Sequence, residues 1–151
     1  MRRTALVCMS IALAWPVLAH GDDAKKDGPK VEGTWLATKA EISGKEMPKK
    51  VTEKLKLTLK KGEYEVVAES TDRGTVTYDT AADPKTMDIK GLEGVNKGKT
   101  FLAIYELKDD KLTICYDLSG KSRPTEFKTQ PNTQLFLVTY ERQKPAEGRD
   151  K

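Results

Sequence analysis

Apolar and polar residues alternate along much of the chain. The run Leu55-Lys56-Leu57-Thr58-Leu59-Lys60 is the clearest case, and Tyr64, Val66 and Ala68 continue the pattern after a Lys61-Gly62 turn. A period of two is typical of a strand with one face in a core and one in water. Together with two runs that are apolar on both faces, this pattern predicts eight strands, at residues 34–42, 55–60, 63–69, 74–79, 86–90, 100–107, 111–117 and 134–142.

The connections between these strands are mostly as short as hairpin turns. Short connections place successive strands side by side and antiparallel, and closure removes the exposed edges of such a sheet. We therefore predict an all-β fold, an eight-stranded antiparallel up-and-down barrel. One short helix is expected between the first two strands, where Pro48 precedes Val51 and Leu55. An immunoglobulin-like sandwich is the alternative, but it predicts long crossovers between its two sheets, and the sequence has only one long loop, from Leu118 to Thr133.

The first residues have the pattern of an export signal. Arg2 and Arg3 precede an apolar run of about 15 residues, shorter than the roughly 18–20 that span a bilayer, and Ala19 ends a plausible cleavage site. We predict a signal peptide at 1–19, a flexible leader at 20–30, the barrel at 31–142 and a disordered tail at 143–151. The destination is then periplasmic or extracellular, with no membrane span in the mature chain. An uncleaved anchor and a lipoprotein signal at Cys8 are the alternatives.

Length and charge restrict the function further. The chain has 151 residues, which points to a single domain, with 27 basic and 23 acidic residues. Loss of Arg2 and Arg3 with the signal peptide leaves 25 basic and 23 acidic residues, a net charge of +2. Nucleic-acid binders usually carry a basic stripe, so we expect no nucleic-acid partner. Cleavage also leaves Cys115 as the single thiol, which we interpret as a packed residue of a strand.

A short motif at the first strand suggests a family. Gly33-Thr34-Trp35 resembles the G-x-W signature of lipocalins, in which the Trp closes the barrel base and an Arg near the last strand packs across its ring. Arg142 stands where such an Arg is expected, and a cation over an indole is worth about 0.5–2 kcal/mol. The resemblance implies that Trp35 and Arg142 form a barrel-closing pair in a lipocalin or calycin-like fold.

Longer stretches resemble an uncharacterised lipocalin-like domain family of exported planctomycete bacterial proteins. The resemblance covers nearly all of 31–142 and implies a fold but almost no function. The stretches that carry it are Val31-Glu32-Gly33-Thr34-Trp35, Pro84-Lys85-Thr86-Met87-Asp88, Gly98-Lys99-Thr100 through Ile104-Tyr105-Glu106-Leu107, Leu112-Thr113-Ile114-Cys115-Tyr116, and Gly120-Lys121-Ser122-Arg123-Pro124-Thr125-Glu126-Phe127.

Catalytic and metal-binding motifs are poorly represented. Gly98-Lys99-Thr100 and Gly120-Lys121-Ser122 lack the glycine five residues earlier that a phosphate-binding loop needs, and both are interpreted as turns. His20 is the only histidine, so a nucleophile in the barrel has no ordinary base and zinc or copper has few ligands. We expect no enzyme activity, no cofactor and no metal site. Paired carboxylates remain a possible exception.

The barrel interior and its mouth are the remaining candidate site. Tyr64, Tyr78, Tyr105 and Tyr116 lie on predicted strands, and an aromatic ring with a polar tip suits an amphipathic ligand. The alternative is that these tyrosines are ordinary core residues. In the long loop, Phe127 is predicted to fold over an open barrel end, with Arg123 meeting an anionic headgroup.

The alternative for this loop is that Pro124 and Phe127 simply anchor it. For the whole chain we expect an exported, non-enzymatic lipocalin-like barrel that binds a small apolar or amphipathic molecule. The second hypothesis is a structural or interaction module, with a side-chain-filled barrel that contacts another envelope protein or a polymer. Internal volume separates the two, because a cavity of about 300 Å³ or more is typical of ligand pockets.

Overall fold

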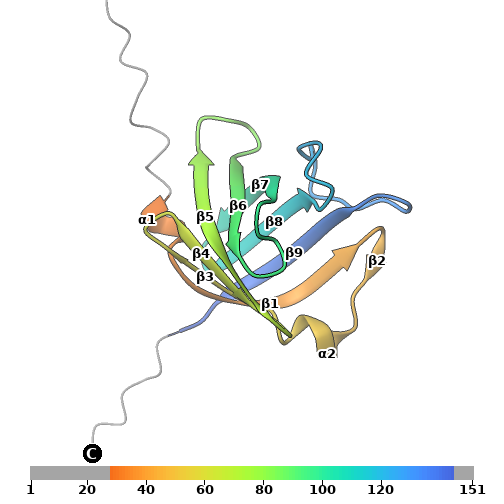
Figure 1. Ribbon diagram of the computed structural model, residues 1–151, viewed down its shortest axis with the longest axis horizontal. Helices are drawn as coiled ribbons and strands as arrows, with labels where there is room; N and C mark the ends of the chain where they lie inside the picture. Colours follow the sequence, from red (N-terminus) through yellow and green to blue (C-terminus); the bar gives the residue numbers. More distant parts are fainter. Residues whose placement is uncertain (1–27, 145–151) are drawn as a thin grey trace, which may run out of the picture.

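The computed structural model describes residues 28–144, and in this part of the chain the strands form one antiparallel sheet in sequence order. β1 (Gly33–Ile42) pairs with both β3 (Lys56–Lys60) and β9 (Leu135–Arg142), so the sheet closes on itself (Figure 1). β1 and β3–β9 make the predicted eight-stranded barrel, which is confirmed, and the sandwich is excluded. The other strands are β4 (Glu63–Val67), β5 (Thr71–Asp79), β6 (Thr86–Glu93), β7 (Thr100–Lys108) and β8 (Lys111–Asp117).

Three short elements accompany the barrel. The helix α2 (Lys49–Thr52) follows Pro48 and lies between the first two barrel strands, as predicted. The hydrophobic pattern does not predict β2 (Lys45–Glu46) or α1 (Gly28–Val31), because they are shorter than the window in which a period can be recognised. α1 crosses the predicted boundary between leader and barrel. The predicted signal peptide, most of the leader and residues 145–151 lie outside the described residues.

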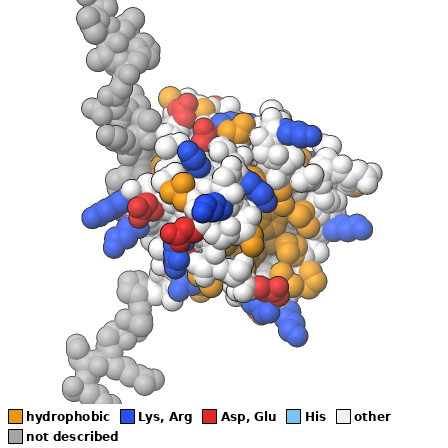
Figure 2. Space-filling view, viewed as in Figure 1, with side chains coloured by type: hydrophobic (Ala, Val, Ile, Leu, Met, Phe, Trp, Pro, Cys, Tyr) orange, Lys and Arg blue, Asp and Glu red, His pale blue; other side chains and the backbone are white. Residues whose placement is uncertain are grey.

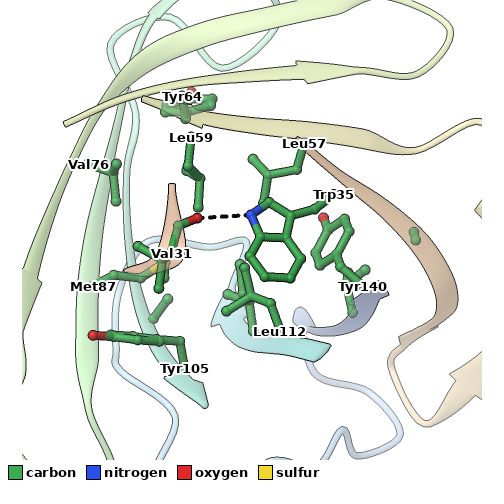
Figure 3. Packing of buried hydrophobic residues seen from close by; sticks show 14 of the residues in the cluster. Val31, Trp35, Leu57, Leu59, Tyr64, Val76, Met87, Tyr105, Leu112 and Tyr140 are labelled. Atoms are coloured by element: carbon green, nitrogen blue, oxygen red, sulfur yellow. Dashed lines mark hydrogen bonds between the residues drawn. The ribbon is translucent and has the colours of Figure 1, made fainter. Parts of the chain in front are cut away.

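Inward-facing side chains fill most of the barrel. In β3, Leu57 and Leu59 are buried while Lys56 and Lys60 are exposed, which is the alternation seen in the sequence. Full burial of one large apolar side chain is worth about 1.5–3 kcal/mol, so this core supplies much of the stability. Figure 3 shows its packing, and its largest fully buried members are Trp35, Tyr105, Met87, Leu112, Val31 and Val138.

The two ends of the barrel differ. At the end that we call the closed end lie α1, the β3–β4, β5–β6 and β7–β8 turns, and the last residues of β9. At the opposite end, the open end, lie α2 and the connections β4–β5 (68–70), β6–β7 (94–99) and β8–β9. This division follows from the antiparallel order, since alternate connections fall at opposite ends of an up-and-down barrel.

The long β8–β9 connection, residues 118–134, crosses the outside of the barrel, and we call it the strap. Near its start, the guanidinium of Arg123 donates to the Ala103 carbonyl at 2.7 Å, to the Met87 carbonyl at 3.2 Å and to Asp88 at 2.6 Å. Near its end, Thr129 donates to Glu41 of β1. These anchors on β6, β7 and β1 hold the strap against the outer face of the sheet.

Apolar side chains outside the barrel explain why the strap stays there. Ile104 and Cys115 are almost fully buried and directly opposite one another across β7 and β8, yet they alternate with inward-facing residues. The Cys115 thiol lies 3.9 Å from the Lys128 carbonyl of the strap. Burial raises the pKa of this thiol to about 11, so it is protonated and unreactive at neutral pH. Cys115 is thus a packed residue, as expected, but outside the barrel core.

Candidate binding pocket

The closed end is sealed by Trp35, whose side chain has no exposed surface. The indole Nε1 donates a hydrogen bond to the Val31 carbonyl at 2.9 Å (Figure 3). The guanidinium carbon of Arg142 lies 4.1 Å from the centre of the Trp35 ring, so the structure brings the two predicted partners together. A side chain at Gly33 would have its Cβ 2.7 Å from an Arg142 nitrogen, which explains the glycine of the motif.

Arg142 also fixes the chain that precedes β1. Its Nη1 donates to the Glu32 carbonyl at 2.6 Å and its Nη2 to the Lys30 carbonyl at 2.8 Å. Its Nε donates to the Asp110 carboxylate at 3.1 Å, which joins the β7–β8 turn to the same group. A planar guanidinium with donors in fixed directions is suited to such a junction. The closed end is therefore held by satisfied polar groups around a buried indole.

A cavity of about 210 Å³ enters the barrel from the open end. Its mouth lies between the β4–β5 turn, which contributes Ala68 and Ser70, and the β6–β7 loop, which contributes Val95 and Asn96. Its walls are mostly apolar or aromatic. The volume is below the roughly 300–1,000 Å³ of pockets for drug-sized ligands, so the cavity does not reach the volume expected from the sequence for a ligand-binding barrel. The cavity therefore suits a smaller molecule, and the rest of the barrel is packed with side chains.

One carboxylate, Asp72 of β5, holds the rim of the cavity. Asp72 is 6% exposed and faces inward. Its Oδ1 accepts a hydrogen bond from the Asn96 backbone N–H at 3.0 Å, and its Oδ2 accepts one from the Asn96 side-chain amide. Gly94 allows this contact, since a Cβ there would collide with the Asp72 carboxylate and lie 2.5 Å from the Thr71 carbonyl. Asp72 thereby positions the β6–β7 loop.

Beside Asp72, the hydroxyl of Tyr64 is buried in the cavity wall. The Tyr64 residue is 6% exposed, and among the described residues its oxygen has no hydrogen-bond partner. Burial, the charge of nearby Asp72 and a side-chain interaction with its carboxylate raise the pKa of Tyr64 to about 12, although the hydroxyl and that carboxylate do not reach full hydrogen-bond geometry. An unpaired buried hydroxyl costs free energy. This site therefore has a polar group ready for a partner from a ligand.

Other aromatic side chains complete the cavity wall. Tyr116 and Tyr140 line it, and burial raises the pKa of both hydroxyls. The nearby Tyr140, Tyr64 and Asp72 further raise the pKa of Tyr116. The Tyr116 ring lies 5.9 Å from Phe101 and 5.3 Å from Phe136, measured between ring centres. The wall thus combines aromatic faces with neutral hydroxyl groups.

The structure divides the four predicted tyrosines between the two halves of the barrel. Tyr64 and Tyr116 line the cavity. Tyr78 and Tyr105 do not, and their rings pack edge to face, 5.8 Å apart. Burial and, to a smaller extent, the charge of Glu32 at the closed end raise the pKa of Tyr78. Glu32 precedes β1 directly. For Tyr78 and Tyr105, the alternative interpretation as core residues fits the observed positions.

The two predicted residues of the long loop lie away from the cavity. Arg123 does not face the mouth, because its guanidinium donates hydrogen bonds to the Asp88 carboxylate and to two backbone carbonyl groups on the outer face. Phe127 does not line the cavity and does not cover the open end, because the strap that carries it runs outside the barrel. Pro124 is buried, in agreement with an anchoring role for the loop residues.

Two residues of the rim, Asp72 and Asn96, are absent from the residues predicted for the site. The sequence does indicate that Asp72 faces inward. Side chains on one face of a strand are two residues apart, and Gly74 and Val76 occupy inward positions, so position 72 lies on the same face. A polar residue at an inward position is uncommon and marks a candidate site. Asn96 has no comparable signal, since its role depends on the contact between the β6–β7 loop and β5.

A scan against protein-family models found no matching family, and searches of curated proteins and of solved structures found no match. The predicted membership of a lipocalin-like family therefore stays a prediction, while the barrel is established by its strand pairing. Within residues 28–144, no helix is long and apolar enough to cross a membrane. In the same range no three His, Cys, Asp or Glu side chains are grouped as metal ligands.

Proposed function

We propose that this protein is an exported, non-enzymatic, lipocalin-like barrel that binds a small apolar or amphipathic molecule. The observation that carries the proposal is the cavity of about 210 Å³ at the open end, with the unpaired Tyr64 hydroxyl in its wall. A barrel that served only as a filled scaffold would have no need for an unsatisfied polar group beside an open volume. Export rests on the pattern of residues 1–19.

Binding in this cavity would follow from burial of apolar surface. Removal of apolar surface from water is worth roughly 25 cal/mol per Å², and the walls offered by Leu57, Val66 and Ile89 are apolar. Polar groups at the rim would then set the orientation of the ligand. The volume favours a molecule smaller than a drug-sized ligand. The closed end, sealed by Trp35, leaves the open end as the entrance.

A second function, that of an interaction module, is favoured by one observation. Val95 at the cavity mouth is 69% exposed, which is unusual for a large apolar side chain. Figure 2 shows a group of hydrophobic side chains on one face of the molecule, with Lys, Arg and acidic side chains around it. Exposed apolar patches can mark protein interfaces. In this case the barrel would contact another envelope protein or a polymer.

Native mass spectrometry of the mature protein, purified gently from its own envelope fraction, tests the proposal. We expect an extra mass of a few hundred daltons or less that is lost on denaturation. The variant Ala68→Phe fills the cavity mouth and should abolish the extra mass. Ala81→Phe introduces the same side chain in the exposed β5–β6 turn at the closed end and should retain it.

Two outcomes would contradict the proposal. A bare polypeptide mass that persists when envelope extract is added back would favour the interaction module. An extra mass that survives in Ala68→Phe would place the bound molecule outside the cavity. In either case the cavity would not be the binding site.

A further inference from the structure

The chemistry of the cavity rim points to the charge of the ligand. Of the described residues that line the cavity, Asp72 is the only acidic one, and none is a Lys, Arg or His. Lys97 and Lys99, which belong to the β6–β7 loop, are exposed and do not line it. An anionic headgroup would thus meet a buried carboxylate and no cation.

Asp72 is also incompletely paired. A carboxylate offers about four acceptor sites, and Asn96 donates to one on each oxygen. Both donors are neutral amides, and within residues 28–144 no Lys or Arg forms a salt bridge with Asp72. Charged groups are seldom buried without an opposite charge. A cation in the cavity would supply that charge.

The neighbouring groups would support a cation as well. Within residues 28–144 the Tyr64 oxygen has no hydrogen-bond partner, and it can accept a hydrogen bond. The rings of Phe101 and Tyr116 form part of the same wall, and the face of an aromatic ring attracts ammonium groups. Carboxylate, hydroxyl oxygen and aromatic faces therefore converge on one small volume.

We propose that the cavity selects small apolar amines, with the ammonium group between Asp72 and the Tyr64 hydroxyl and the apolar body against the aromatic wall. This inference rests on the proposed function, since it names the class of ligand for the same cavity. The ammonium would donate to Asp72 and to Tyr64, which removes both the unpaired charge and the unpaired hydroxyl. Hydrogen bonds of this charge-assisted kind are about twice as strong as neutral ones.

Three probes of equal chain length test this selection. Hexylammonium, hexanol and hexanoate share an apolar body and differ only in the headgroup, and calorimetric titration of the full mature chain measures their dissociation constants. Since a hydrogen bond to a charged group is worth enough to change affinity about tenfold, we expect hexylammonium to bind about tenfold more tightly than hexanoate, with hexanol between them.

Three variants test whether the preference for hexylammonium depends on Asp72 and Tyr64 at the cavity rim. Asp72→Asn keeps the shape of the side chain and should reduce hexylammonium binding about tenfold while hexanol binding changes little. Glu69→Gln removes a carboxylate that is 84% exposed and does not line the cavity, and it should change nothing. Tyr64→Phe removes only the hydroxyl and should weaken hexylammonium binding by about threefold.

The outcomes separate this inference from the proposed function. If hexanoate binds as tightly as hexylammonium, or if the preference survives in Asp72→Asn, the cavity does not select amines. If hexanol binds to the wild type but not to Ala68→Phe, the proposed function stands even then. If none of the three probes binds, both proposals are overturned. The wild-type comparison of probes decides the inference even if Asp72→Asn does not fold.

Discussion

The two ends of the barrel differ in how completely their buried polar groups are hydrogen-bonded. At the closed end, the indole N–H of Trp35 and the guanidinium of Arg142 have partners at 2.6–3.1 Å. At the open end, the Tyr64 hydroxyl has no partner among the described residues, and Asp72 is bonded only by neutral donors. Complete pairing stabilises a fold, whereas incomplete pairing next to a cavity favours a ligand.

If the proposed function holds, this difference places stability mainly at one end of the barrel and binding at the other. The closed end buries its largest side chain, Trp35, and the open end keeps a cavity of about 210 Å³ inside the barrel. Changes at the closed end should thus lower the free energy of unfolding with little effect on binding by the folded protein. Changes at the open end should alter binding at a smaller cost in stability.

The largest expected effect follows from Trp35→Ala. Loss of a fully buried Trp should lower the free energy of unfolding by about 3–5 kcal/mol, measured by urea denaturation followed by circular dichroism. Leu36→Ala, at the adjacent and 41% exposed position, is the control and should cost much less. A loss below about 1 kcal/mol for Trp35→Ala would mean that Trp35 does not seal the core.

A smaller effect is expected for Arg142→Lys. Lysine keeps the charge but cannot donate in the fixed directions that reach both carbonyl groups, so we expect a loss of about 2 kcal/mol in the same denaturation experiment. The control is Arg73→Lys, because Arg73 is half exposed and its ion pairs with Glu65 and Glu93 lie on the surface. Surface pairs contribute about 0–1 kcal/mol. Equal losses for the two variants would remove the special role of Arg142.

The smallest expected difference between a variant and its control concerns two glycines of the β6–β7 loop. Gly94 and Gly98 have φ values of +83° and +80°, so alanine at either costs roughly 1–2 kcal/mol in backbone strain. Only Gly94→Ala also collides with Asp72, since nothing lies within 4 Å of a Cβ at Gly98. We expect Gly94→Ala to be less stable than Gly98→Ala by about 1 kcal/mol and to weaken hexylammonium binding. Equal stability and equal affinity would argue against the contact.

The fold could be predicted from the sequence because each barrel strand produces a local pattern of alternating apolar and polar residues. The alternation in residues 55–60 is a direct consequence of one buried and one exposed face, and it survives in the structure. Short turns then determine which strands are neighbours. The pairing of Trp35 with Arg142 was predicted on different grounds, from the resemblance of Gly33-Thr34-Trp35 to the G-x-W signature.

The candidate site was accessible only in part, because it depends on contacts between distant segments. Tyr64 and Tyr116 could be proposed from their strands, but their depth in the barrel depends on register. Arg123 was expected at the barrel mouth and lies on the outer face, because nothing local in the sequence shows on which side of the wall a 17-residue loop runs. The apolar outer positions of Ile104 and Cys115 are the signal that such a loop is needed there.

The hydrogen bond between Arg142 and the Lys30 carbonyl has a practical consequence. It places the first and last described segments together at the closed end, opposite the mouth of the cavity. A surface tether, a fusion partner or a purification tag attached through either segment would extend away from the cavity mouth. Immobilised protein would then present its open end to solution, and ligand screening on a sensor surface should report the same affinities as free protein.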